Sequence, residues 1–505
     1  MINRRKFLGG TATAMGMATA GTEFAYLAQL PSVRAAESKL PAQGVRFHPD
    51  IEPLVRFIEG TERDRLVEEI AHRIRGGLTY HDLVAALLLA GVRNIQPRPI
   101  GFKFHAVMVV NSAHLASLAS PDADRWLPIF WALDQFKSSQ AADVREGDWM
   151  LGAVEESRVP KGHLARQAFI EAMDAWDESA ADAAITGLVR HAGAAEIFEL
   201  LCSYGVRDFR ELGHKQIYIA NSFRTLEVIG WHHAEAVLRG VVYALLDRVG
   251  DSNPSQSDLP ADRPFRRNRD AVKSLRADWK SGSNDPRLAT DLLAAAREGS
   301  AIDTSRVAIE LLNGGASPAV VFDGVQAAAA EMLMRRPGIL SLHATTFLNA
   351  VRYAWHRVQD DTVRRLLLVQ AAAFLPLYRG QPARKTVRID QLEALPSSAG
   401  TEDPLAEIFA GVGKNTTESA QRLMGWLSEH PDPRPFAEMA RRLVFLKGRD
   451  SHDYKFSSAV LEDYEVLSGP WRNRVLAASL FNLRGSSDSD NPLVGRIRDA
   501  LGKHP

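Results

Sequence analysis

Apolar and polar residues alternate with a helical period through nearly the whole chain. Three stretches, 83–90, 234–246 and 364–374, are long and rich in Ala and Leu, whereas strands are short and rich in β-branched residues. Strict alternation of β-branched and polar residues, which would indicate half-buried strands, is almost absent. The pattern therefore predicts an all-α fold.

The expected helices follow the same order in four successive stretches. Each stretch begins with an apolar helix, continues through a turn into a helix that carries a histidine motif, and closes with an amphipathic helix often preceded by tryptophan. A repeated order of this kind predicts a helical array of four related units around a central pocket. The alternative is that Ala- and Leu-rich helices resemble one another by composition alone. The expected units are 60–140, 165–250, 300–380 and 404–485.

The histidine motif recurs with similar spacing. His105 and His343 each precede an asparagine by six positions, while His214 lies one place early relative to Asn221, with Lys215 in the aligned position. His452 precedes a serine, Ser458, by six positions. The longer gap between the second and third motifs contains the polar stretch 251–286, which predicts a surface loop, as does 380–404. Histidines that recur in this way can meet at one point and bind a metal ion.

Each motif histidine also has a structural interpretation, since a lone helical histidine is commonly a hydrogen-bonded core residue. Recurrence favours a ligand role for His105, His343 and His452. The one-residue offset of His214 turns a helical side chain by about 100°, which makes it a weaker candidate. Six residues along a helix rotate by about 600°, so histidine and asparagine do not share a face. The asparagines are therefore expected to bond backbone groups between helices.

Lys455 lies three residues after His452 and shares its helical face. A buried lysine beside a cation loses its proton, because desolvation and like charge both lower its pKa. The neutral amine can then bind CO₂ and offer a carbamate oxygen to a metal. The alternative is a solvated lysine beside Asp453. His81 opens an apolar helix, where it is either a ligand steadied by Asp82 or a helix cap.

Composition excludes several classes of function. The net charge is zero and basic residues form no stripe, so nucleic acid is not an expected partner. No segment after the N-terminal one approaches a membrane span. The single cysteine, Cys202, permits no internal disulfide and is expected in the core. There is no HExxH, CxxC or dinucleotide-binding glycine motif, so a hydride cofactor is not indicated.

The first residues match a twin-arginine export signal. Arg4-Arg5-Lys6-Phe7-Leu8 precedes a stretch rich in small and apolar residues, and Val33-Arg34-Ala35 offers a cleavage site. Residues 1–35 are therefore expected to be a signal peptide read by the twin-arginine machinery, and 36–505 a single domain in the periplasm or secreted. A chance arginine pair is the alternative. This route exports folded proteins, which suits a cofactor inserted before export.

Several of these segments resemble the questin oxidase-like family of helical non-haem iron oxygenases. Leu342-His343-Ala-Thr-Thr is similar to that family's I-H-A-V-T, and Ser451-His452-Asp-Tyr-Lys455-Phe to its E-H-A-I-K-F. Phe104-His105-Ala and Tyr80-His81-Asp are similar to its other two histidine segments, in the same order. The resemblance implies iron held by His81, His105, His343, His452 and a carboxylated Lys455. The family arginine is absent near Val109, and His214 has no counterpart.

Together these features predict an exported non-haem iron protein that oxidises an aromatic or polycyclic small molecule with O₂. Fe(II) is the expected metal, with zinc and manganese open. One alternative is a metal-dependent hydrolase or lyase on the same scaffold, in which the metal activates water. Another is a helical-repeat binding protein without catalysis. The candidate metal ligands are His81, His105, His214, His343, His452 and Lys455.

Overall fold

The computed structural model describes residues 44–248, 253, 258–379, 387–396 and 402–502. The expected signal peptide, 1–35, lies outside the described residues. The chain divides into two units, 1–44 and Val45–Pro505, and the helices of the described residues belong to the second. The all-α prediction is confirmed, because the structure is 72% helical with 23 α-helices and no strand among the described residues.

The N-terminal helices surround α5, which is apolar on every side. Its first turn is capped by the Thr79 hydroxyl, which accepts from the backbone N–H of Asp82, and every residue from Leu83 to Arg93 is buried. A helix without a polar face needs cover all round, and α3, α8 and, from later in the chain, α13 (Ala234–Leu245) supply it. The first six helices are α3 (Glu52–Gly60), α4 (Arg63–Arg75), α5 (Tyr80–Asn94), α6 (His105–Met108), α7 (Val110–Leu118) and α8 (Leu127–Glu146).

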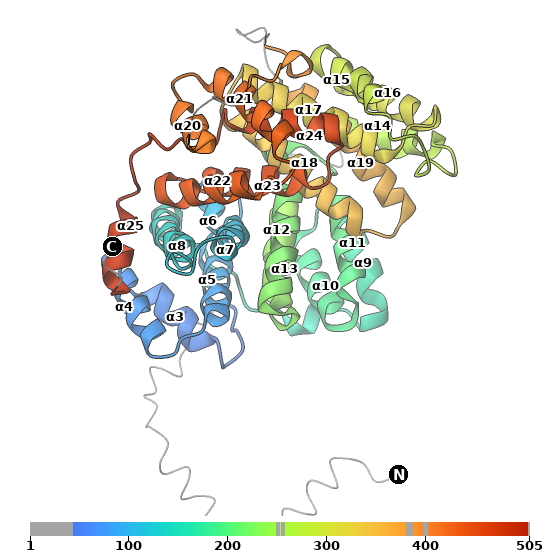
Figure 1. Cartoon of the computed structure of the whole chain (residues 1–505). Helices are drawn as coiled ribbons and strands as arrows, with labels where there is room; N and C mark the ends of the chain where they lie inside the picture. Colours follow the sequence, from blue (N-terminus) through green and yellow to red (C-terminus); the bar gives the residue numbers. More distant parts are fainter. Residues whose placement is uncertain (1–43, 249–252, 254–257, 380–386, 397–401, 503–505) are drawn as a thin grey trace, which may run out of the picture. The chain divides into compact units, whose positions relative to one another are not determined.

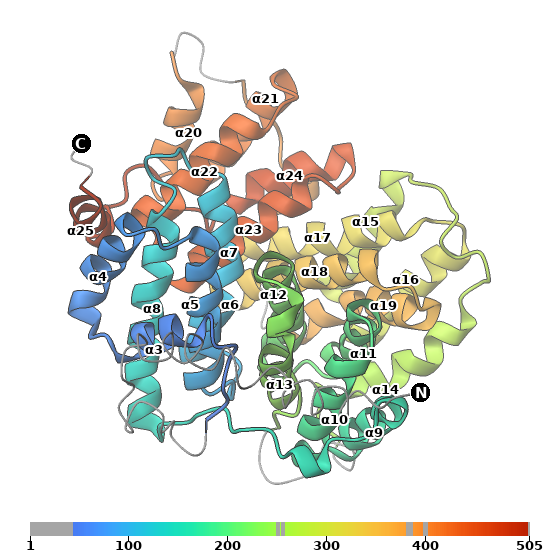
Figure 2. The ribbon, with the colours of Figure 1, turned by 90° about the horizontal axis from the view of Figure 1, so that it is seen from below.

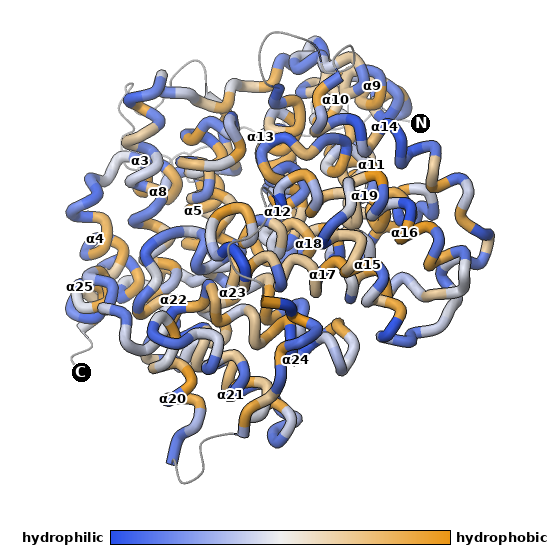
Figure 3. The backbone as a smooth tube through the Cα atoms, turned by 90° about the horizontal axis from the view of Figure 1, so that it is seen from above, coloured by the Kyte–Doolittle hydropathy of each residue, from blue (hydrophilic) through white to orange (hydrophobic). Residues whose placement is uncertain are grey.

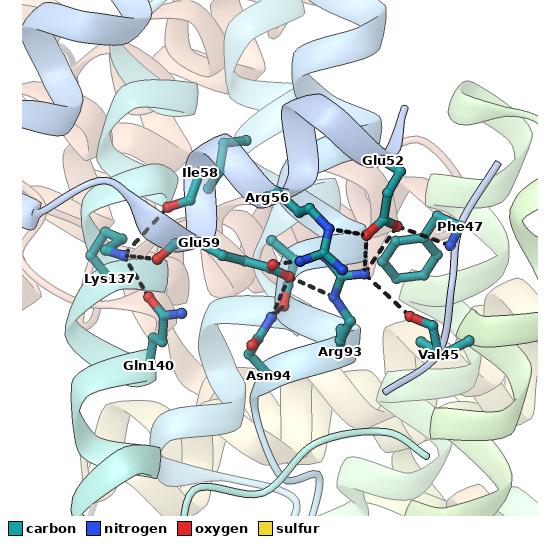
Figure 4. A network of polar contacts seen from close by, with 11 residues as sticks. Val45, Phe47, Glu52, Arg56, Ile58, Glu59, Arg93, Asn94, Lys137 and Gln140 are labelled. Carbon is teal, nitrogen blue, oxygen red and sulfur yellow. Dashed lines mark hydrogen bonds and ion pairs between the residues drawn. The ribbon is translucent and has the colours of Figure 1, made fainter. Parts of the chain in front are cut away.

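A network of buried charges joins α3 to α5 (Figure 4). The Arg93 guanidinium is buried, and it donates to Glu52 at 2.8 Å and to Glu59 at 2.7 Å. Lys137 of α8 donates to the Glu59 carbonyl at 2.8 Å. Each charge of this network has an opposite charge or a carbonyl beside it, so the interactions offset the cost of desolvation. The network therefore fixes helix packing and leaves no group free for chemistry.

The second group of helices corrects one expectation. Part of the stretch 251–286, predicted as a surface loop, forms α14, because Asn268 is buried there and donates to Ser305 and Gln370. This helix is short and strongly polar, so periodicity did not reveal it. Cys202 is buried in α11, as predicted. These helices are α9 (Gly162–Ala175), α10 (Glu178–His191), α11 (Ala194–Gly205), α12 (His214–Ile229), α13 (Ala234–Leu245) and α14 (Arg263–Ala271).

The remaining helices include the most deeply buried one. In α17 every residue except Ala319 and Arg335 is buried, and the hydrophobic colouring of Figure 3 runs along α17 and α18. These helices are α15 (Ala289–Glu298), α16 (Ala301–Asn313), α17 (Pro318–Arg335), α18 (Ile339–Arg357), α19 (Asp361–Tyr378), α20 (Pro404–Gly411), α21 (Thr416–Glu429), α22 (Arg434–Lys447), α23 (Ser451–Tyr464), α24 (Gly469–Ser479) and α25 (Leu493–Ala500).

Short 3-10 segments join some of these helices, and two of them lead directly into a motif histidine. Within the described residues, no helix combines the length and the apolar character that a membrane span requires. The 3-10 segments are η1 (Phe102–Phe104), η2 (Glu156–Arg158), η3 (Arg210–Gly213), η4 (Trp231–His233), η5 (Val272–Ser274), η6 (Pro286–Leu288) and η7 (Ile389–Gln391).

The helices that carry the motif pack against one another in a closed ring. α7, which continues from the short α6, contacts α12 and α23, and α18 contacts the same two helices. Figures 1 and 2 show these four helices side by side although they come from distant parts of the sequence. The ring brings the four motif copies together. The division of the chain into four related units stays a prediction.

Candidate metal centre

Three motif histidines meet inside the ring of helices. His105, His214 and His343 are buried, and their ligand nitrogens lie within 4.8 Å of one another. His214 Nε2 is 3.0 Å from His105 Nε2 and 2.9 Å from His343 Nε2. These residues begin or lie near the beginning of α6, α12 and α18. The three imidazoles form a group that could hold a metal ion.

The other nitrogen of each ring faces a backbone carbonyl. His105 Nδ1 lies 2.9 Å from the Phe102 oxygen and His343 Nδ1 lies 2.6 Å from the Ile339 oxygen, while His214 Nδ1 contacts the Glu211 oxygen. Because a carbonyl only accepts, each Nδ1 must carry the proton, which leaves a lone pair on each Nε2. Three lone pairs therefore face one another, an arrangement that a shared cation stabilises.

Burial keeps these imidazoles neutral. Burial, and then the charge of Lys455, lower the pKa of His343 to about 3 and the pKa of His105 well below its usual value. Burial, and then the neighbouring His343, lower the pKa of His214 strongly as well. Neutral imidazoles do not have to release a proton before they bind a metal. The group is therefore ready for a cation at any pH near neutrality.

His452 is the fourth imidazole of the centre. Its ring centroid lies 4.4 Å from that of His105 and 5.1 Å from that of His343. Its Nε2 is buried without a hydrogen-bond partner in the described part of the chain, and its Nδ1 lies 3.3 Å from Asp450 Oδ1. Asp450 also caps α23, and its bond with His452 lowers the pKa of the Asp450 carboxyl to about 2. A carboxylate behind a histidine is the usual support of a metal ligand.

Lys455 completes the group from one turn further along α23. Its ammonium is fully buried, and Nζ has no hydrogen-bond partner among the described residues. Burial lowers the pKa of Lys455 to about 7, so a large share of the amine is neutral at physiological pH. The solvated lysine considered from the sequence is ruled out by this burial.

The asparagines that end the first three motifs lie around one small cavity together with Lys455. The Asn221 amide donates to the Met108 carbonyl at 3.0 Å, and the Asn349 amide donates to Asp463 at 3.0 Å. The backbone bond expected between helices is confirmed for Asn221, while Asn349 bonds chiefly to a carboxylate and reaches the Ala459 carbonyl only at 3.4 Å. The four motif positions and Lys455 line a cavity of about 20 Å³, which has room for one water. Those lining residues are Asn111, Asn221, Asn349, Lys455 and Ser458.

Two expectations from the sequence are corrected by the geometry. His81 is not part of the centre: its side chain is 54% exposed, and Nδ1 lies 3.7 Å from Asp82. His214, the weaker candidate, is the central member. Its offset does not matter because it is the first residue of α12, set by the preceding turn. The rotation expected between His105 and Asn111 along one helix does not apply, because the two residues lie in different helices, α6 and α7.

Comparison with known proteins adds no name to this geometry. No family model matches the chain, and neither a curated protein nor a solved structure matches it significantly. The resemblance to the questin oxidase-like family therefore rests on the short motifs alone. The class that the structure supports is an all-α protein with a buried histidine centre able to hold a metal ion.

Proposed function

We propose that this protein is an exported non-haem iron oxygenase that oxidises an aromatic or polycyclic small molecule with O₂. The observation that carries the proposal is the convergence of three imidazoles. Each donates its Nδ1–H to a backbone carbonyl, so the Nε2 lone pairs of all three point toward one another. Imidazole nitrogens suit iron, zinc and copper by ligand type. When bound, iron would supply the binding and activation of O₂.

The nitrogens are close enough for one cation to be shared. His214 Nε2 lies 3.0 Å from His105 Nε2 and 2.9 Å from His343 Nε2, and all three ligand nitrogens lie within 4.8 Å. Imidazole ligands alone do not select one metal, so the choice of iron in this proposal follows from the resemblance of the motifs to the questin oxidase-like family.

Lys455 would supply the anionic ligand that the imidazoles lack. Its neutral amine can attack CO₂, forming a new N–C bond and releasing one proton to give a carbamate. The first turns of α12, α18 and α23 meet at the centre, and helix N-termini favour negative charge. A carbamate beside the cation would balance its charge and satisfy those dipoles.

The substrate would approach from the side of the turn before His105. A Cβ at Gly101 would lie 3.8 Å from Cε1 of both His105 and His214, so Gly101 leaves a gap beside the rings. Phe102 is 80% exposed and Ile339 is 50% exposed, and their carbonyls hold His105 and His343. In this proposal the two exposed apolar side chains would receive a flat aromatic substrate.

Metal analysis of the protein purified without oxygen tests the proposal. About one iron per chain is expected in the natural protein and none in the double variant His343→Ala, His452→Ala. The matched control is His81→Ala, which removes an exposed histidine outside the centre and should keep its iron. O₂ uptake with a panel of polycyclic phenols would then identify a substrate.

The other outcomes separate the alternatives. Stoichiometric zinc without O₂ uptake would favour the hydrolase or lyase, in which the metal activates water. A well-folded protein that binds no metal would overturn the proposal and leave a helical binding protein. Iron retained in the double variant would show that the histidine centre is not where the metal binds.

A further inference from the structure

The turn before His214 has an unusual backbone. Glu211, Leu212 and Gly213 are all left-handed, with φ of 56°, 54° and 79°. Left-handed conformation costs a non-glycine residue about 1–2 kcal/mol, so two such residues in succession need support from their surroundings. Such strain commonly lies at functional sites. Here it points the Glu211 carbonyl at His214 Nδ1.

Gly213 cannot be replaced within this turn. Besides its positive φ, a Cβ there would lie 2.5 Å from the ring of Phe347. Phe347 is one helical turn after His343 on α18. The turn that orients His214 therefore packs directly on the helix that carries the next ligand.

Buried charges hold the two ends of the turn. Lys215 is fully buried, and Nζ donates to Asp208 Oδ2 at 2.8 Å and to the Asp247 carbonyl at 2.9 Å. Asp208 Oδ1 also accepts from the backbone N–H of Arg210 at 3.2 Å, and the Arg210 guanidinium donates to Asp262. Arg210, just before the left-handed segment, and Lys215, just after it, therefore both bond to the Asp208 carboxylate.

The turn before His105 is built in the same manner. Phe102 is left-handed with φ of 45°, and its carbonyl faces His105 Nδ1. The next residue, Lys103, is held by a buried carboxylate, with Nζ 2.8 Å from Asp143. In both places a left-handed residue three positions before the histidine offers its carbonyl, and a lysine–aspartate pair lies beside it.

We propose that the Lys215–Asp208 ion pair is a positioning device for His214, which holds the strained turn so that the Glu211 carbonyl fixes the ring. The inference rests on the proposed metal centre. An ion pair buried this deeply contributes little net stability against an apolar replacement, so its retention is better explained by geometry. The pair keeps His214 Nε2 between those of His105 and His343.

A charge-balanced double variant tests this role. Asp208→Asn with Lys215→Met removes both charges and should leave a folded protein, because Arg210, which also pairs with Asp208 at 3.5 Å, keeps its bond to Asp262 and no buried ion is left alone. Loss of a supporting contact typically weakens metal binding about 10–100-fold, and we expect that loss for Fe(II), measured by chelator competition. The control double variant, Asp182→Asn with Arg239→Met, removes a pair between α10 and α13 in which only the arginine is buried and should keep the natural affinity.

A second readout does not depend on the metal. In protein carrying ¹⁵N-labelled histidine, the hydrogen-bonded Nδ1–H of His214 should give a slowly exchanging signal that is lost in the Asp208 and Lys215 double variant and kept in the control. Should that double variant fail to fold, the single variant Asp208→Asn replaces it, because Lys215 keeps the Asp247 carbonyl. About threefold weaker binding is then expected.

Each outcome decides the inference. Weaker binding and loss of the signal in the Asp208 and Lys215 variants alone support it. Unchanged affinity in those variants, or an equal loss in the control, overturns it while the metal centre stands. A natural protein that binds no metal overturns both the proposed function and this inference.

Discussion

Two fully buried lysines lie close to the histidine centre, and their surroundings are opposite. Lys215 Nζ donates to the Asp208 carboxylate and to a carbonyl. Lys455 Nζ has no partner among the described residues, and Lys455 lines the small cavity at the asparagine ends of the motifs. Burial is the largest cause of the lowered pKa in both; Asp208 opposes it at Lys215, and Asp450 opposes it at Lys455. The difference between the two lysines is the hydrogen bonding of Nζ, which Lys215 has and Lys455 lacks among the described residues.

The difference shows which buried polar groups to regard as functional. Burial alone does not distinguish them, because the Arg93 network is as deeply placed as the centre and is fully paired. Unpaired buried atoms do not distinguish them either, because Arg207 and Arg210 also carry such atoms. What distinguishes the centre is that two of them, Lys455 Nζ and His452 Nε2, accompany three converging imidazole lone pairs.

The largest effect expected from this comparison is on stability. Lys215→Met should lower the free energy of unfolding toward the ~3–5 kcal/mol that an unpaired buried charge costs, because Asp208 loses its closest cation and keeps only Arg210, at 3.5 Å. Lys455→Met should raise it by about 1–3 kcal/mol in metal-free protein at pH 7, since it removes an unsatisfied amine. Urea unfolding followed by circular dichroism measures both. Changes of the same sign would refute the contrast between the two lysines.

The same Lys455 substitution should have the opposite effect on metal binding. Lys455→Met should weaken Fe(II) affinity about 100-fold in buffer that contains bicarbonate, and removing CO₂ should weaken the natural protein by a similar factor. Chelator competition in the presence and absence of bicarbonate checks this. An affinity that does not depend on bicarbonate would exclude the carbamate, even if Lys455 proved necessary.

The pH dependence of metal binding should follow Lys455. Its ammonium form cannot bind a cation, so affinity should fall about tenfold per pH unit below its pKa of about 7, and level off above it. In Lys455→Met the affinity should be flat from pH 6 to 8, because the pKa of His343 is about 3. Burial also raises the pKa of Asp463 to about 7, so a slope that persists in the variant would point to Asp463 instead.

The smallest effect is expected from the support of His452. Asp450→Asn keeps the helix cap but removes the charge behind Nδ1, and should weaken Fe(II) binding about tenfold or less. Asp82→Asn, which changes the residue beside the exposed His81, serves as the matched control and should change nothing. Equal affinities in the two variants would mean that Asp450 only caps α23.

Much of the centre could be predicted from the sequence because its histidines recur. The repeated motif was sufficient to select His105, His343 and His452, whereas Lys455 was selected with the help of the family resemblance, and the structure brings all four together. Resemblance to the family motif wrongly predicted His81 as a ligand, because a short matching segment carries no information on whether its histidine faces the centre or the solvent. The paired lysines, Lys215 and Lys103, carried no signal, since their aspartates are 7 and 40 positions away.

The sequence by itself determined the helices, their apolar faces and the recurrence of histidine, because these depend on local periodicity. Only the tertiary structure decided that His214 is the central imidazole and that His81 stands apart. Helical phase describes rotation about one axis, whereas a metal centre depends on where different helices begin and on the turns before them. Those turns are left-handed at Phe102, Glu211 and Leu212. None of these residue types favours a left-handed backbone, so the conformation could not be predicted from the sequence and depends on packing in the folded protein.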